Sequence, residues 1–288
     1  MATTATGAPT QYENSHVPVL RITPPGQWWV IPFGELWAYR ELLYFYVWRE
    51  LKVRYKQTVV GAAWAVIQPL MTMLVFSLFF GKLAHIPSGG LAYPIFYYSA
   101  LLPWMYFQAS LQNATNKVVE NQYVITKVYF PRLILPFSAV LSGLVDFGIS
   151  FLMFVVIMIY YRIQPMWTIL FLPLFLLMAV ATALGVGLWL SALNAVYRDV
   201  RYVVPFLLQF WMFASPVVYP SSLVPAKWRV LYELNPMAGV IEGFRWSLTG
   251  TGDPPSRMLL ISAAMVVAIV VTGIMYFQKM ETTIADVV

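Results

Sequence analysis

The chain has 288 residues, of which 60% are hydrophobic and 10% are charged, and its mean hydropathy is +0.70. Soluble domains carry about 45–50% apolar and about 25% charged residues, so this composition excludes an ordinary soluble domain and a disordered chain and is typical of a membrane protein. The absence of cysteine and the two isolated histidines argue against disulfides and a metal centre, and the net charge of +6 is better explained by membrane topology than by nucleic-acid binding.

Residues 1–34 are polar and rich in proline, and they lack the apolar stretch of a signal peptide, so we predict a flexible cytosolic tail. Residues 35–57 are too charged to cross a membrane and too aromatic to be freely solvated. We therefore predict an amphipathic helix along the inner leaflet, with four cations facing lipid phosphates or a partner protein: Arg49, Lys52, Arg54 and Lys56. The alternative is a collar of snorkelling side chains on the first membrane span.

Residues 58–288 form the predicted membrane domain. A helix needs about 20 apolar residues to cross a bilayer. Six runs meet that length, at about 59–81, 91–111, 133–161, 167–193, 203–219 and 258–277. Backbone groups in lipid must be satisfied internally, so we expect an all-helical bundle of six spans in which Pro69, Pro103 and Pro173 kink helices without ending them.

The distribution of basic residues predicts the orientation. Six spans place both termini on one side, and that side carries twelve of the 18 Lys and Arg residues. Because positive charge is enriched in cytoplasmic loops, we expect both termini to be cytoplasmic.

Two polar connections lie on the predicted cytosolic side. We expect residues 112–132 to form a short cytosolic helix, and residues 194–202 to form a second, shorter link. Each is a candidate surface for a partner protein that acts from below. The candidate contact residues are Lys117, Glu120, Tyr123, Lys127, Arg198 and Asp199. The alternative for each is an ordinary solvated loop.

The connection at 220–257 is unusually long for a compact bundle. Asn235 followed by Pro236 is an N-cap signal, and Glu242 and Arg245 lie one turn apart in the helix that follows. We expect a pair of re-entrant helices on the outer side, with Asn235, Glu242 and Arg245 as candidate gate residues. The alternative is a hairpin on the outer surface.

The chain contains no phosphate-binding loop motif, so we expect a separate subunit to bind ATP and Mg, and we expect no cofactor and no enzymatic activity in this chain. Asp146 is a single carboxylate within the spans and a default site candidate, but we expect it to be structural, hydrogen-bonded to Ser142 or Ser150. Two rival functions stay open: a proton-coupled carrier that uses Asp146, and a polyprenyl-lipid enzyme that uses Glu233, Glu242 and Asp253.

Aromatic and amide side chains share helix faces in two spans. Phe206, Gln209, Phe210 and Phe213 recur at helical spacing in the fifth run, and Trp64 and Gln68 are one turn apart in the first. Rings stack on sugars and amides bond hydroxyls, so these faces could form a track for a carbohydrate chain. The alternative is ordinary helix packing.

Three segments carry a family resemblance: residues 49–70, 125–136 and 193–220. They are similar to the transmembrane subunit of ABC type-2 polysaccharide exporters, which handle O-antigen, capsule and teichoic acid. The resemblance implies a homodimer in the bacterial inner membrane, with two ATPase subunits beneath, exporting a polymer linked to undecaprenyl pyrophosphate. It places Trp64, Gln68 and the aromatic stripe of the fifth run on the translocation path. Our own hypothesis is that the four cations of the N-terminal helix lie where the pyrophosphate enters, because guanidinium and ammonium groups neutralise phosphate. It does not identify the polymer.

Overall fold

The computed structural model describes residues 33–56, 61–251 and 256–287, and in these residues the regular structure is helical, without a strand. All but the last two residues of the predicted tail, and the candidate Asp253, lie outside this part of the chain. The helices are α1 (Phe33–Ala38), α2 (Arg40–Lys56), α3 (Gly61–Phe76), α4 (Tyr93–Glu120), α5 (Gln122–Ile125), α6 (Ile134–Tyr160), α7 (Leu172–Val196), α8 (Val200–Phe213), α9 (Ala226–Glu233), α10 (Pro236–Thr249) and α11 (Ser256–Val287).

Three short stretches complete the helical elements. A π-helical stretch, Ser77–Leu83, continues α3. The 3-10 turns Trp167–Phe171 and Ser221–Leu223 precede α7 and α9, respectively. Pro69 and Pro103 lie inside continuous helices, as predicted. Pro173 likewise does not end its helical stretch, but it lies in the first turn of α7, where the chain passes from 3-10 to α-helix.

Within the described part of the chain, four helical stretches are long and apolar enough to cross a membrane: Ala63–Leu83, Ile134–Tyr160, Trp167–Val196 and Arg257–Glu281. They match the first, third, fourth and sixth predicted spans. With 28 residues, α4 is about 42 Å long and could also cross, although it is more polar. The 14 residues of α8 extend for only about 21 Å, and the chain then turns after Phe213, so the prediction of a continuous fifth span to residue 219 was wrong.

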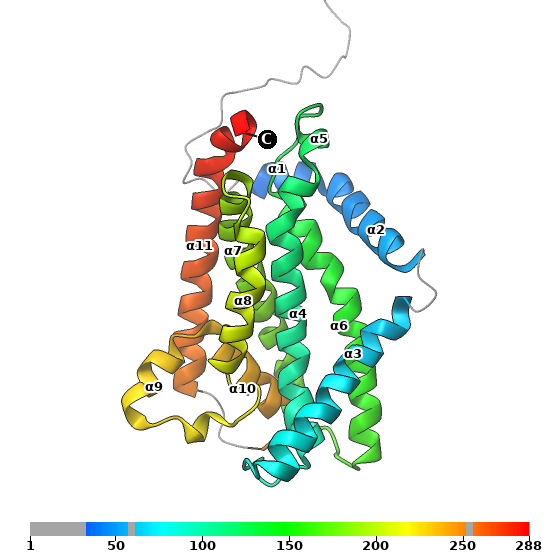
Figure 1. Ribbon diagram of the computed structural model, residues 1–288, viewed down its shortest axis with the longest axis vertical. Helices are drawn as coiled ribbons and strands as arrows, with labels where there is room; N and C mark the ends of the chain where they lie inside the picture. Colours follow the sequence, from blue (N-terminus) through cyan, green and yellow to red (C-terminus); the bar gives the residue numbers. More distant parts are fainter. Residues whose placement is uncertain (1–32, 57–60, 252–255, 288) are drawn as a thin grey trace, which may run out of the picture.

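The core lies around α4, which packs against α6 on one side and α7 on the other, while α7 packs along α11 (Figure 1). The last pair approaches closely because two glycines face each other. A Cβ atom at Gly273 would lie 2.4 Å from the carbonyl oxygen of Gly185. Small residues let helix backbones meet in this way in membrane bundles.

The predicted N-terminal helix is two helices, because the chain turns at Tyr39 between α1 and α2. α2 runs obliquely down the outside of the bundle and packs on α6 (Figure 1). Its buried side includes Tyr46, and its other side exposes large rings, among them Tyr44, Phe45 and Trp48. Aromatic rings thus lie on both the buried and the exposed sides of α2, so the structure does not bear out a clear division into an apolar and a polar face, and the place of the helix at the inner leaflet stays a prediction.

The elements separate into two ends. α1, α5, the link between α7 and α8 and the C-terminal end of α11 lie at one end of the bundle, and α9 and α10 lie towards the other (Figure 1).

Candidate functional site

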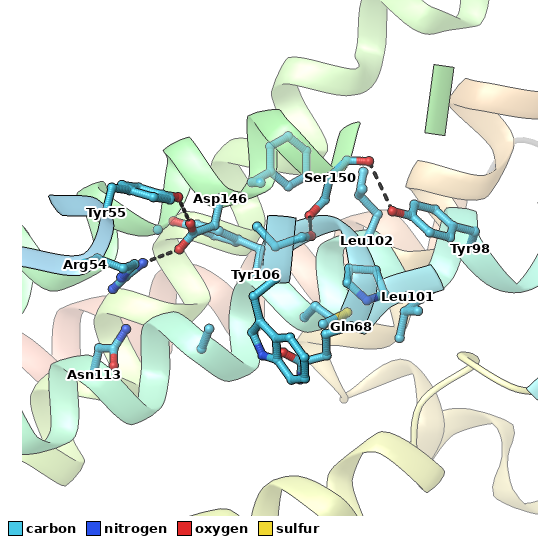
Figure 2. Close-up of a pocket in the computed structure, with 17 residues that line it drawn as sticks. Arg54, Tyr55, Gln68, Tyr98, Leu101, Leu102, Tyr106, Asn113, Asp146 and Ser150 are labelled. Atoms are coloured by element: carbon cyan, nitrogen blue, oxygen red, sulfur yellow. Dashed lines mark hydrogen bonds and ion pairs between the residues drawn. The ribbon is translucent and has the colours of Figure 1, made fainter. Parts of the chain in front are cut away.

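A cavity of about 330 Å³ lies between α3, α4 and α6, beside the last turn of α2 (Figure 2). Its lining combines polar groups with aromatic rings. The polar groups are Arg54, Tyr55, Gln68, Asn113, Asp146 and Ser150, and the rings are Trp64, Tyr98, Tyr106 and Phe147.

Asp146 of α6 is held by two groups from α2. Its carboxylate pairs with the Arg54 guanidinium and accepts a hydrogen bond from the Tyr55 hydroxyl (Figure 2). The predicted serine partners were wrong: Ser142 donates to the Ala139 carbonyl in its own helix, and Ser150 donates to the Ala65 carbonyl of α3. A partly buried carboxylate is better compensated by a cation than by a hydroxyl, and α2 supplies that cation.

Tyr55 acts as a neutral donor in this arrangement. Burial, reinforced by the hydrogen bond to Asp146, raises the pKa of Tyr55 to about 12. The pKa of Tyr55 in the folded state lies above its ordinary value of 10. The contribution of the neutral Tyr55 hydroxyl to the stability of the folded protein is therefore complete below pH 10 and is lost as the pH rises through 12.

Further charged contacts fasten α2 to the end of α4. Lys117 is 5% exposed and pairs with Glu50 of α2. Arg49 donates to the Asn121 side-chain oxygen at 3.0 Å, and its guanidinium lies 5.3 Å from the centre of the Tyr46 ring.

The four predicted phosphate-binding cations therefore do not form one patch. Arg54 is partly buried and pairs with Asp146, whereas Arg49, Lys52 and Lys56 are exposed. Of these three, Arg49 bonds to Asn121, and Lys52 and Lys56 form no ion pair with any described residue.

The predicted partner-contact residues also divide. The prediction of one short helix over 112–132 was wrong, because residues 112–120 continue α4 and a separate helix, α5, covers only Gln122–Ile125. Lys117 is buried within this chain, and its contact with a partner stays a prediction. Glu120, Tyr123 and Lys127 are exposed, and the Lys127 ammonium lies 3.8 Å from the centre of the Tyr123 ring.

The second connection is a turn of three residues, 197–199, between α7 and α8. Its Arg198 and Asp199 are exposed. This turn lies at the same end of the bundle as α5 (Figure 1).

The aromatic stripe of α8 is exposed. Phe206, Phe210 and Phe213 are 60%, 63% and 47% exposed, Gln209 is also exposed, and the opposite face of the helix is buried through Val204 and Leu208. None of the four stripe residues lines the cavity that holds Trp64 and Gln68. The two predicted parts of the path thus lie on separate surfaces of one chain.

Asn235 joins the start of α10 to the end of α8. Its side-chain oxygen accepts from the Met237 backbone NH and the Trp211 indole NH, at 3.1 and 2.8 Å. Its side-chain nitrogen donates to the Ala214 carbonyl and the Ser215 hydroxyl, at 3.1 and 2.9 Å. The predicted N-cap is confirmed, and the same side chain fixes the turn that ends α8.

The other two predicted gate residues form a buried pair. Arg245 is 5% exposed, pairs with Glu242 at 3.1 Å, donates to the Pro216 carbonyl at 2.7 Å and lies over the Phe96 ring. Glu242 also accepts from the Ser221 backbone NH. Most of α10 is buried and most of α9 is exposed, so only α10 is enclosed by the bundle as a re-entrant helix would be.

The carboxylates proposed for the rival enzyme have structural partners where they are described. Glu242 is bonded to Arg245, and Glu233 lies 3.7 Å from Arg257. They do not line the cavity beside Asp146.

Tyr55, Glu50, Asn113 and Asn121 were not among the predicted residues. The available signal was that a lone acid in an apolar helix, Asp146, needs a cation from elsewhere in the chain. The basic helix at 40–56 was one source of such a cation, although Arg132 and Arg162 lie nearer to Asp146 in sequence.

The ABC-2 type transporter family matches residues 41–249. The chain belongs to this family. The resemblance of its three segments is thereby confirmed, and the chain is a multi-pass membrane protein of the ABC-2 type.

The chain is 30% identical over 256 residues to the O-antigen export system permease protein RfbA of Myxococcus xanthus, across 88% of this chain and 97% of that protein. It is 27% identical over 244 residues to the protein of the same name from Klebsiella pneumoniae, across 83% and 92%. It is 21% identical over 195 residues to the polysialic acid transport protein KpsM of Escherichia coli, across 67% and 76%.

Proposed function

We propose that this chain is the membrane subunit of an ATP-driven exporter that moves a polysaccharide, linked to undecaprenyl pyrophosphate, across the bacterial cytoplasmic membrane. The names of its relatives, two O-antigen export permeases and a polysialic acid transport protein, support the substrate class. The polymer handled by this chain is not specified by them.

The exposed stripe of α8 carries the proposal. Phenylalanine is about as favourable in lipid as leucine, whereas an unpaired amide is not, and this face presents the amide of Gln209 among three phenylalanines. Phe206 and Phe210 contact each other, with ring centres 4.9 Å apart. Such a face suits sugar rings, which stack on aromatic groups through their apolar sides. Two copies of the chain would turn these faces towards each other and enclose a path.

The energy for transport comes, in this proposal, from two ATPase subunits that hold ATP and Mg. The exposed Glu120, Tyr123, Lys127, Arg198 and Asp199 form the surface that meets them. These exposed residues are joined directly to two helices of the core, because Glu120 is the last residue of α4 and the turn at 197–199 follows α7. The membrane topology that fits this arrangement has both termini in the cytoplasm.

The lipid-linked pyrophosphate enters, in this proposal, beside the exposed ammonium groups of Lys52 and Lys56, with Arg49 behind them. At the other end, the clamp made by Asn235, Glu242 and Arg245 acts as the outer gate. The rival function as a proton carrier has less support, because Asp146 already has Arg54 and Tyr55 as partners.

The test is replacement of both stripe rings, Phe206→Ala with Phe210→Ala, in the host bacterium. Losing about 1.4 kcal/mol of sugar stacking would lower the rate of polysaccharide export about tenfold. Leu207→Ala is the matched control, because Leu207 is also exposed on the same helix, at 50%, but is aliphatic. Unchanged surface polysaccharide in the double variant, or an equal loss in the control, would contradict the proposal.

A further inference from the structure

We propose that the cavity between α3, α4 and α6 binds one neutral sugar unit of the transported chain. This inference rests on the proposed function and deepens it, because it gives each copy of the chain a sugar-binding site apart from the α8 stripe.

The charge of the cavity selects a neutral ligand. Among the described residues that line it, Arg54 is the cation and Asp146 the anion, and the two are paired. A phosphate that approached Arg54 would also meet the Asp146 carboxylate, and like charges at contact distance repel. A hydroxylated ligand without charge avoids this conflict.

The cavity offers hydrogen-bonding groups that are not used within the chain. A carboxylate can accept about four hydrogen bonds. Arg54 and Tyr55 occupy one site on each oxygen of Asp146, whose side chain is 29% exposed. The side-chain amides of Gln68 and Asn113 bond to no described residue. Acceptors and amides directed into one space match the mixed donors and acceptors of sugar hydroxyls.

Aromatic rings supply the apolar part of the site. Trp64 is 59% exposed and lines the cavity, so part of its indole is open to a ligand. Behind it, the rings of Tyr98 and Tyr106 are fixed, because their hydroxyls donate to the carbonyls of Ser150 and Val140 at 3.2 Å. A pre-formed wall of this kind costs little conformational entropy on binding.

The volume fits a short unit. Small-molecule sites usually measure about 300–1,000 Å³. At about 330 Å³ this cavity lies at the lower end of that range, so it suits a single unit and not a folded length of polymer.

Saturation-transfer NMR on the purified full-length chain tests the proposal. The chain is held in nanodiscs, since glycoside detergents would occupy a sugar site. The probes are the methyl glycosides of glucose, galactose, mannose and N-acetylglucosamine, with glycerol 3-phosphate as a charged comparison. We expect signal transfer to at least one glycoside and a loss of at least about tenfold in its affinity in the Gln68→Leu, Asn113→Leu double variant. The matched control is Gln122→Leu, which removes an exposed amide from α5, outside the cavity and the α8 stripe, and should leave the signal unchanged.

Equal binding by the chain and the double variant would overturn the proposal, as would transfer to glycerol 3-phosphate alone, which would indicate a lipid-headgroup site. Gln68→Leu alone repeats the test if the double variant does not fold, because Gln68 is exposed and its side chain makes no bond to a described residue. This binding assay contains neither ATP nor an ATPase. The proposed export function is tested separately from sugar binding: it fails if cells that lack the chain still carry full surface polysaccharide.

Discussion

Several charged groups are held by a side chain from another helix, as in the pairs Arg54–Asp146, Lys117–Glu50 and Arg257–Glu233. Lys117 illustrates the energetics, because it contacts two carboxylates of different kinds. Glu50 is on α2 and largely covered, whereas Glu120 lies 3.8 Å away on the surface with a side chain that is 59% exposed. Breaking a buried pair leaves an uncompensated charge, while an exposed pair contributes little.

We therefore expect Glu50→Gln to destabilise the protein by about 3 kcal/mol, and Glu120→Gln by less than about 1 kcal/mol. Denaturation of the purified protein, followed by circular dichroism, measures both. Exchanging the charges, Glu50→Lys with Lys117→Glu, should recover part of the loss. Equal stability of the two single variants would show that the α2–α4 pair is not important.

We expect the basic residues of α2 to fall into two groups, according to whether their replacement changes thermal stability. Lys52→Gln with Lys56→Gln removes exposed cations only, so we expect export to fall while thermal stability is unchanged. Arg54→Gln leaves Asp146 without its cation and should lower the melting temperature as well. Export assays and melting curves on the same variants check this. Normal export by the double lysine variant would refute the proposed place of pyrophosphate entrance.

Sequence reasoning identified Asp146, Arg54, Trp64 and Gln68 individually but not the cavity they share. Its expectation for Asp146 considered only serines on the same helix, whereas the actual cation is 92 residues away in sequence. Local spacing cannot reveal a partner on another helix, so the pairing was missed although both residue types were noticed.

At the scale of helices, prediction succeeded where apolar runs coincide with single helices, as in α6, α7 and α11. Prediction failed where a change in polarity along the sequence does not coincide with the end of a helix. The polar end of α4 continues as helix because α2 covers it with Glu50 and Arg49. The apolar run in the sequence extends beyond the end of α8. The helix ends there because Asn235 and Arg245 bond the carbonyls of Ala214 and Pro216 in the turn that follows.

The hydrogen bonds by which Asn235 joins the start of α10 to the end of α8 should be important for the stability of the protein. In Asn235→Ala, α10 loses its N-cap, worth about 1 kcal/mol, and the indole NH of Trp211 loses its acceptor, at about 1–3 kcal/mol. We expect a melting temperature several degrees lower. Trp211→Phe removes only one of these bonds and should cause a smaller decrease. An Asn235→Ala protein as stable as the parent would show that the end of α8 is fixed by other contacts.

At the scale of the whole molecule, the account requires two copies that meet through α8. The chain has no cysteine, so a single introduced cysteine reports on proximity without a background. Phe210→Cys should cross-link two copies in the membrane. Leu152→Cys, equally exposed but on α6, should not. Cross-linking through Leu152→Cys alone would place the interface elsewhere.

The central claim is that this chain is a conduit for glycan that moves only when a separate ATPase acts on it. The most direct measurement is glycan movement across vesicles that contain the chain together with the ATPase that copurifies with it. The account predicts that lipid-linked polysaccharide reaches the far side when ATP and the ATPase are both present, and that omitting either one stops it. Movement of polysaccharide by the chain alone, without nucleotide, would contradict the account.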